Sequence, residues 1–254
     1  MSATSTQATP PKPRNATAVI IGAGDYIGAE IAKKFASEGY IVFVGRRQAE
    51  KLEPLKAEIE AAGGRIVAKA LDARDEDQMM AFYQEAENTA PIEVSVFNIG
   101  ANVNFPLVET TSRVFRKVWE MACFAGFLSG REAARHMAPR GAGSIFFTGA
   151  TAGLRGGVGF AAFASAKFGL RAVAQSTARE FGPQGIHVAH LVIDSGVDTA
   201  WVRDMRKKNA GDGPVTDHVL MRPAAVAEAY WAIHQQPSDA RTFEQEIRPA
   251  GEKW

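Results

Sequence analysis

Cysteine is almost absent from this 254-residue chain, in which Cys123 is the only one. A single thiol cannot form an intrachain disulfide, and it cannot supply a metal site built from several thiolates. Long hydrophobic runs are lacking too: no stretch reaches the roughly 18 apolar residues of a membrane-spanning helix. We therefore exclude disulfide-stapled, thiolate-metal and membrane-spanning classes of protein, and we expect neither a bound metal nor a membrane partner.

An excess of charge of either sign is also lacking. The chain has 29 Lys and Arg against 28 Asp and Glu, which gives a formal net charge of +1. Without a global field of one sign, nucleic acid is not an expected partner. Residues 1–15 are polar and Pro-rich and have no apolar segment typical of a secretory signal. We expect them to form a disordered tail with solvated Lys12 and Arg14, ahead of one cytoplasmic domain over residues 16–254.

Apolar stretches of two kinds alternate along the rest of the chain. Short β-rich runs predict seven strands, at about residues 16–22, 40–44, 66–70, 92–97, 144–147, 186–193 and 242–247. Between them apolar residues recur at helical spacing, and the longest helical stretches lie at about 113–137 and 160–181. Alternation of strand and helix requires parallel strands joined by right-handed crossovers. We therefore predict an α/β fold: a doubly wound parallel sheet of about seven strands with helices on both faces.

A glycine-rich turn follows the first predicted strand and opens the first predicted helix. Glycines at such a turn let backbone N–H groups approach a pyrophosphate at the positive end of the helix. The motif lies where that mechanism requires it, although a tight turn without a ligand is the alternative. We predict that the turn binds a dinucleotide through Gly22, Gly24, Asp25, Tyr26, Ile27 and Gly28.

Two arginines, Arg46 and Arg47, end the second predicted strand, and no acid follows until Glu50. At this position a carboxylate would bind the ribose 2′-hydroxyl of NAD, whereas arginines suit a 2′-phosphate. The pattern favours NADP(H), with NAD(H) possible, unless the arginines are only solvated surface charges. After the third strand, Asp72 and Ala73 are candidates to contact the adenine. Asp72 could also cap the helix that follows.

With these motifs in this order, the chain resembles the short-chain dehydrogenase/reductase family over about residues 16–250. The resemblance implies a Rossmann-type fold, oxidoreductase activity with a nicotinamide cofactor, and a homodimer or homotetramer assembled through two long helices. It assigns cofactor contacts to Asn98, Gly100, Lys167 and Thr199, with Lys167 at the nicotinamide ribose. It also implies a substrate lid over residues 199–221. Tyr26 departs from the family pattern, because it stands at the middle glycine of the motif.

The predicted catalytic centre departs further from the family pattern. The family's Tyr-x-x-x-Lys motif reads Phe163 to Lys167 here, the catalytic serine falls on Ala150, and the asparagine of the long fourth helix falls near Cys123. Phe163 has no proton to donate and Ala150 has no hydroxyl group. General acid–base catalysis is worth about 10²–10⁴-fold, so an ordinary alcohol dehydrogenase could not readily lose both groups. Of the four catalytic positions only Lys167 is kept.

Two polar residues near the end of the sixth predicted strand, His190 and Asp194, are candidates to supply the missing proton. For His190 the alternative is a core histidine with its hydrogen bonds satisfied, and Cys123 is expected to be a small core residue. The sequence thus predicts an NADP(H)-dependent oxidoreductase with non-standard proton delivery, acting on an apolar ketone, enone or imine. The alternative is an inactive cofactor-binding protein that serves as a sensor, a scaffold or a partner of an active paralogue.

Overall fold

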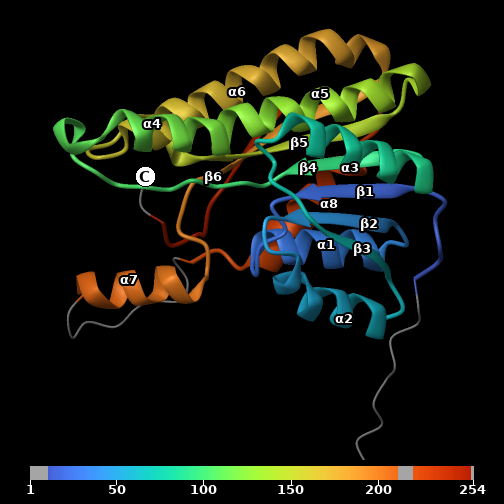
Figure 1. Ribbon diagram of the computed structural model, residues 1–254, viewed down its shortest axis with the longest axis horizontal. Helices are drawn as coiled ribbons and strands as arrows, with labels where there is room; N and C mark the ends of the chain where they lie inside the picture. Colours follow the sequence, from blue (N-terminus) through green and yellow to red (C-terminus); the bar gives the residue numbers. More distant parts are fainter. Residues whose placement is uncertain (1–10, 211–219, 253–254) are drawn as a thin grey trace, which may run out of the picture.

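The computed structural model describes residues 11–210 and 220–252. A seven-stranded sheet lies between two layers of helices (Figure 1). Its strand order is β3-β2-β1-β4-β5-β6-β7, and every neighbouring pair is parallel. The strands are β1 Thr17–Ile21, β2 Ile41–Arg46, β3 Arg65–Ala70, β4 Ile92–Phe97, β5 Gly143–Ala150, β6 Ile186–Ile193 and β7 Glu244–Ile247. This topology confirms the predicted doubly wound parallel sheet.

Helices cover both faces of the sheet, so its central strands are buried on both sides. The helices are α1 Ile27–Ser37, α2 Glu53–Ala61, α3 Glu76–Thr89, α4 Ser112–Trp119, α5 Ala125–Met137, α6 Ala161–Phe181, α7 Ala200–Ala210 and α8 Pro223–His234. In β1, Ile20 packs with the cluster beneath α1, α2 and α8, whereas Val19 and Ile21 pack with the cluster beneath α3, α5 and α6. Because both faces are apolar, β1 is a continuous apolar run from Ala18 to Ile21, as is typical of buried parallel strands.

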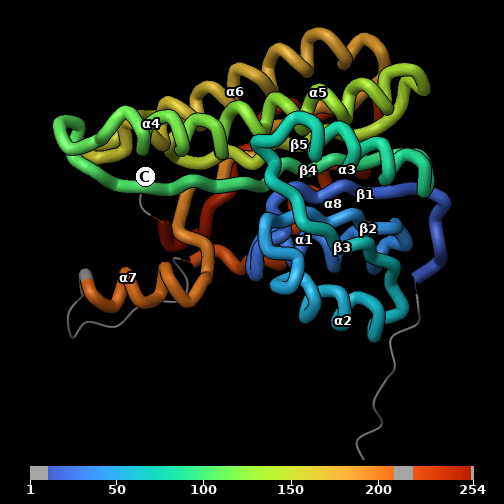
Figure 2. Tube along the Cα trace, in the orientation of Figure 1, coloured from blue at the N-terminus to red at the C-terminus, as the bar shows by residue number. Residues whose placement is uncertain are grey.

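The strand order reverses between β1 and β4, whose carboxyl ends therefore flank a crevice. In open parallel sheets, ligands bind at this point, where successive crossovers pass to opposite faces. Beyond the end of β6 the chain runs to α7, which projects from the body of the domain (Figure 2). Within the part of the chain that the structure describes, no helix combines the length and apolar character needed to cross a membrane.

The helical stretch predicted over residues 113–137 is interrupted. It forms α4, then one π-helical turn over Glu120–Phe124, then α5. Cys123 lies in the π-helical turn, is buried with 4% exposure and packs with Val118 and Phe163. Burial also raises the pKa of its thiol. Cys123 is thus a small core residue, as the sequence suggested.

The structure describes the end of the amino-terminal segment around Arg14. Residues 1–10 of the predicted tail lie outside the described part of the chain, but Arg14 makes specific contacts. Its Nε donates to the carbonyl of Glu38 at 2.9 Å, and its guanidinium lies 4.9 Å from the centre of the Tyr40 ring. Arg14 is exposed, as expected for a solvated charge, and these contacts also hold it against the end of α1 and the Tyr40 ring.

Large apolar side chains stay exposed along α4, α5 and α6: Phe115, Trp119, Phe127 and Phe168 are each 39–42% exposed. Because contiguous apolar surface of this kind marks interfaces, we expect a dimer or tetramer. Multi-angle light scattering should then give two or four times the chain mass of 27.3 kDa. The variant Phe127→Glu with Phe168→Glu should shift the protein toward the monomer. A parent particle of one chain mass at micromolar concentration would contradict this prediction.

Candidate active site

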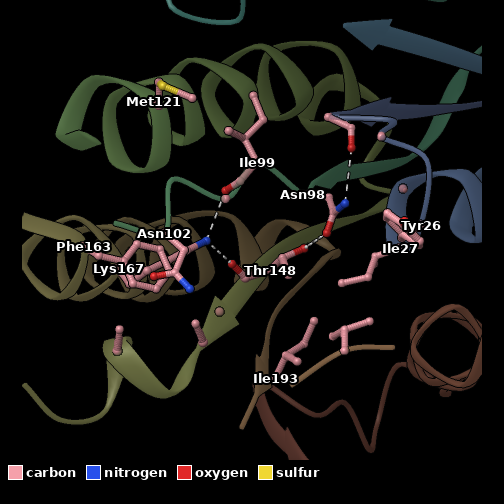
Figure 3. Close-up of a pocket in the computed structure, with 18 of the residues that line it drawn as sticks. Tyr26, Ile27, Asn98, Ile99, Asn102, Met121, Thr148, Phe163, Lys167 and Ile193 are labelled. Carbon is pink, nitrogen blue, oxygen red and sulfur yellow. Dashed lines mark hydrogen bonds between the residues drawn. The ribbon is translucent and has the colours of Figure 1, made fainter. Parts of the chain in front are cut away.

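A cavity of about 1160 Å³ opens at the carboxyl ends of the strands. The glycine turn before α1, the ends of β2 to β6 and the start of α6 supply its walls, part of which is drawn in Figure 3. The structure brings every predicted cofactor-binding residue to this cavity: Gly22, Gly24, Asp25, Tyr26, Ile27, Gly28, Arg46, Arg47, Asp72, Ala73, Asn98, Gly100, Lys167 and Thr199. Most of these positions follow the ends of parallel strands, so alternation of strand and helix places them together, whereas Lys167 reaches the cavity from α6.

The glycine turn has distinct requirements at its three glycines. Gly22 has a φ of +88°, which favours glycine. A Cβ at Gly28 would lie 2.3 Å from the carbonyl oxygen of Gly22, so no side chain fits between the helix and the turn. A Cβ at Gly24 would meet nothing within 4 Å, because this glycine faces open space. The turn therefore leaves room for a ligand at Gly24 while Gly28 keeps the helix close.

Asn98 fixes the glycine turn to the centre of the sheet. Its Nδ2 donates to the carbonyl of Gly22 at 3.2 Å, and its Oδ1 accepts from the Thr148 hydroxyl at 3.1 Å (Figure 3). The Thr148 hydroxyl also lies 2.7 Å from the Tyr230 hydroxyl. This chain of hydrogen bonds joins β4, β5 and α8 beneath the turn, so Asn98 positions the turn as well as lining the cavity.

Charged residues at the ends of β2 and β3 form two ion pairs. Arg46 Nη1 donates to Asp25 Oδ1 at 2.7 Å, which ties the second strand to the glycine turn. Arg74 Nε donates to Asp72 Oδ1 at 2.9 Å, and this guanidinium lowers the pKa of the Asp72 carboxyl. The predicted helix-capping role of Asp72 was wrong. Asp75 caps α3 instead, by accepting from the backbone N–H of Gln78, since Asp72 lies too far ahead of the first turn.

Lys167 is the ionisable group at the inner end of the cavity. It projects from α6, is 2% exposed, and donates from Nζ to the carbonyls of Thr148 at 2.8 Å and Ile99 at 3.2 Å (Figure 3). An ammonium has three N–H groups. No carboxylate pairs with Lys167 among the described residues. Burial therefore lowers its pKa to about 8.

The other catalytic positions of the family pattern are apolar in this cavity. Phe163 lies one helical turn before Lys167, and Ala150 ends β5, and both line the cavity with Phe160. Leu154 and Trp201 are two further apolar residues that follow β5 and β6, and neither lines the cavity. The inner wall thus combines one ammonium with an apolar surface.

Neither candidate for a replacement acid reaches the cavity. His190 is fully buried, with Nδ1 2.9 Å from Glu244 Oε2, and burial lowers the pKa of its ring. Asp194 is 4% exposed and accepts hydrogen bonds from Thr151 and Arg248. Within the described residues, both lie outside the cavity lining. Both side chains are held by their partners, which agrees with the alternative that the sequence left open for His190, a histidine bound within the core.

Residues after β6 attach α7 to the rest of the domain. The Thr199 hydroxyl accepts from the backbone N–H of Val202 at 3.1 Å. The Tyr26 hydroxyl accepts from the backbone N–H of Ala200, also at 3.1 Å. Tyr26 therefore links the glycine turn to α7, a contact that the family's middle glycine could not make. Residues 211–219 of the predicted lid lie outside the described residues.

Sequence reasoning missed the lining residues Asn102 and Met121, and it noted Arg155 only as part of a glycine-rich loop. Asn102 follows the end of β4, Arg155 follows the end of β5, and Met121 lies on the π-helical turn. Position after a strand was the available signal for Asn102 and Arg155. No periodicity could have indicated Met121, because the π-helical turn changes which side of the helix faces the cavity.

No group of three or more His, Cys, Asp or Glu side chains is arranged to hold a metal ion in residues 11–210 and 220–252.

Residues 16–210 match the family model described as short chain dehydrogenase. This chain belongs to the short-chain dehydrogenase family. The match covers the sheet up to β6 and the whole of α7, so every wall of the cavity lies within it.

Individual relatives agree with this family assignment. A cis-4-hydroxycyclohexanecarboxylate dehydrogenase of Sinomonas cyclohexanicum is 32% identical over 232 residues, which cover 89% of this chain and 90% of the relative. The crystal structure of a short-chain dehydrogenase from Rhodopseudomonas palustris is 65% identical, covers 93% of this chain and 100% of that one, and has a TM-score of 0.81. An actinorhodin polyketide ketoreductase with NADPH shares the fold at 22% identity, with a TM-score of 0.84 over 94% of this chain and 98% of that one.

Proposed function

We propose that this short-chain dehydrogenase is an NADP(H)-dependent oxidoreductase that reduces a ketone, enone or imine group of an apolar small molecule, with Lys167 as the proton donor. The observation that carries the proposal is the buried Lys167 ammonium, which lines the cavity beside an apolar wall and has two carbonyls as its partners. The alternative donors His190 and Asp194 do not line that cavity.

The residues present fit a dinucleotide. The cavity of about 1160 Å³ exceeds the roughly 300–1,000 Å³ of an ordinary small-molecule pocket, which leaves room for a substrate beside a dinucleotide. The open space at Gly24 lies at the start of α1, where backbone N–H groups favour a pyrophosphate. Arg46 and Arg47 would hold a 2′-phosphate, and Lys167 and Thr199 would contact the nicotinamide end. When bound, the nicotinamide supplies a hydride to the substrate carbon.

Lys167 completes the reduction by proton transfer. An Nζ–H bond breaks, an O–H bond forms at the substrate oxygen (or an N–H bond at an imine nitrogen), and the neutral amine then takes a proton from water. Two hydrogen bonds to carbonyls orient the ammonium and leave one N–H group, which the nicotinamide ribose and the substrate would share. With a pKa of about 8, Lys167 is charged at neutral pH and still acidic enough to donate.

Two glycine substitutions distinguish an effect on NADPH binding from an effect on the stability of the fold. In Gly28→Ala the new methyl group meets the backbone of Gly22, so we expect NADPH binding to weaken at least tenfold and the free energy of unfolding to fall by about 1–3 kcal/mol. Gly24→Ala meets no protein atom within 4 Å, so it should weaken NADPH binding while leaving stability unchanged. Fluorescence titration and urea denaturation measure the two effects. Unchanged NADPH binding in both variants would contradict a dinucleotide at this turn.

A comparison of the affinities for NADPH and NADH tests whether Arg46 and Arg47 bind the 2′-phosphate. Because a hydrogen bond to a charged group contributes about 1.5–3 kcal/mol, NADPH should bind at least tenfold more tightly than NADH. The double variant Arg46→Ala with Arg47→Ala should abolish this preference, because it should weaken the binding of NADPH and not that of NADH. The exposed Arg179 on α6 is the matched control, because Arg179→Ala removes the same charge far from the cavity. Equal affinities of the parent for NADPH and NADH would contradict the assignment.

Turnover is tested by rapid mixing of the protein and NADPH with a panel of apolar ketones, enones and imines. We expect NADPH oxidation with at least one class and none with the corresponding saturated hydrocarbons. Tight NADPH binding without turnover of any class would contradict the proposal and favour a cofactor-binding protein without catalytic activity.

A further inference from the structure

We propose that Arg155 binds a carboxylate at the substrate end of the cavity, so that the substrate is an apolar carbonyl compound or imine that carries a carboxylate. The inference deepens the proposed function and rests on it for which end of the cavity takes the substrate. It stands on where Arg155 lies, on what its guanidinium contacts and on the charges that line the cavity.

Arg155 lies in the loop between β5 and α6, on the same side of the cavity as the reacting centre. It lines the cavity together with Ala150, Gly157, Phe160 and Phe163. The loop turns immediately after the strand, and the backbone N–H of Arg155 donates to the carbonyl of Thr151 at 3.2 Å. The side chain is 61% exposed and lines the cavity, while its Nη2 lies beside the buried Asp194.

Among the described residues, the acid that pairs with Arg155 is Asp194, which also has other partners. Asp194 accepts from the Thr151 hydroxyl at Oδ1 and from Arg248 at Oδ2, and Arg248 is 13% exposed. Arg155 Nη2 lies 3.5 Å from Asp194 Oδ1, at the outer limit of a hydrogen bond. This ion pair engages Nη2 alone, and among the described residues Nε and Nη1 of Arg155 have no hydrogen-bond partner. Most of its donors therefore remain available to a ligand.

The charges that line the cavity are unevenly distributed. Among the described residues, its acidic lining consists of Asp25 and Asp72, which lie near the ends of β1 and β3 and pair with Arg46 and Arg74. The charged groups that line the substrate end are both cations, Lys167 and Arg155. Such a surface attracts anions.

The chemistry of these groups specifies the anion. A guanidinium binds a carboxylate through two parallel hydrogen bonds, and one guanidinium matches its single charge. The walls formed by Phe160, Phe163 and Ala150 suit the apolar body of the molecule. Lys167 lies at the inner end of the cavity and Arg155 in its exposed part. A substrate with its carbonyl oxygen at one end and a carboxylate at the other would contact both cations.

Binding of benzoate and benzamide tests this inference without any turnover. The two probes share a ring and a planar head group but differ in charge. Isothermal titration of the protein, with and without NADP⁺, should give benzoate at least fivefold tighter binding than benzamide. Arg155→Gln should weaken the binding of benzoate at least fivefold and leave the binding of benzamide unchanged. The affinity of Arg155→Lys for benzoate should lie between those of the parent and Arg155→Gln. Arg179→Gln on α6 is the matched control and should change neither.

Equal affinity of the parent for both probes, or unchanged benzoate binding in Arg155→Gln, would overturn the carboxylate assignment. Because Arg155 is largely exposed, Arg155→Gln should keep the melting temperature of the parent, and that measurement verifies the fold. The proposed function fails in a different way, by an absence of NADPH oxidation with every carbonyl compound and imine. Benzoate binding can succeed or fail independently of that outcome.

Discussion

Replacing Lys167 by methionine is expected to lower kcat for carbonyl reduction by about 10²–10⁴-fold at saturating NADPH, because the variant loses its general acid. Methionine keeps an unbranched side chain of similar length, so it can occupy the buried site between Ile99 and Thr148. NADPH should also bind less tightly, since Lys167 is a predicted ribose contact, and titration of NADPH separates this effect from kcat. Lys69→Met is the control: this lysine on β3 is 42% exposed and paired with Glu85.

The pH dependence of kcat gives an independent test of the same residue. Burial lowers the pKa of Lys167 to about 8, so the donating ammonium is present below that pH and is lost above it. We therefore expect kcat for reduction to fall as the pH rises through about 8. Lys167→Arg keeps the positive charge but does not release its proton in this range. It should be slow at every pH and show no such decline. A parent kcat that stays constant well above pH 8 would contradict proton donation by Lys167.

The sheet could be predicted because its central strands are buried on both faces and their sequences are therefore apolar along nearly their whole length. After Thr17, β1 is continuously apolar, since Ile20 packs toward α1 and α8 while Val19 and Ile21 pack toward α3 and α5. Parallel pairing then brings the carboxyl ends of the strands together, and every predicted cofactor-binding residue lines one cavity. The π-helical turn over Glu120–Phe124 could not be predicted, because a single altered turn changes no more than a residue or two of an apolar periodicity.

The roles of individual polar side chains depended on partners that are distant in sequence or that compete locally. Asp72 pairs with Arg74 rather than capping α3, because Asp75 stands closer to the first turn. Asp194 is held by Arg248, from beyond β7, and is therefore withdrawn from the cavity. His190 is similarly bound to Glu244. Sequence order placed these acids and the histidine near the site, but only the tertiary contacts decide which of them face the substrate.

The double variant Ala150→Ser with Phe163→Tyr is expected to raise kcat for apolar ketones by about tenfold, by adding a second proton donor and an orienting hydroxyl. Both parent side chains line the cavity, so both new hydroxyl groups have space to reach a substrate. Positions 163 and 167 are one turn apart on α6, where side chains are neighbours. The Lys167 charge should then lower the pKa of the new tyrosine and make it the better acid.

The gain should be partial, because Cys123 still occupies the π-helical turn and the wall around Phe163 is packed for a phenyl ring. Phe160→Tyr is the matched control: it adds the same hydroxyl to the same cavity, but position 160 precedes the first turn of α6. It should not accelerate reduction. Adding Lys167→Met to the double variant should remove the gain, because the tyrosine then loses the neighbouring charge. A folded double variant that binds NADPH and is no faster than the parent would show that the absent hydroxyl groups do not limit this site.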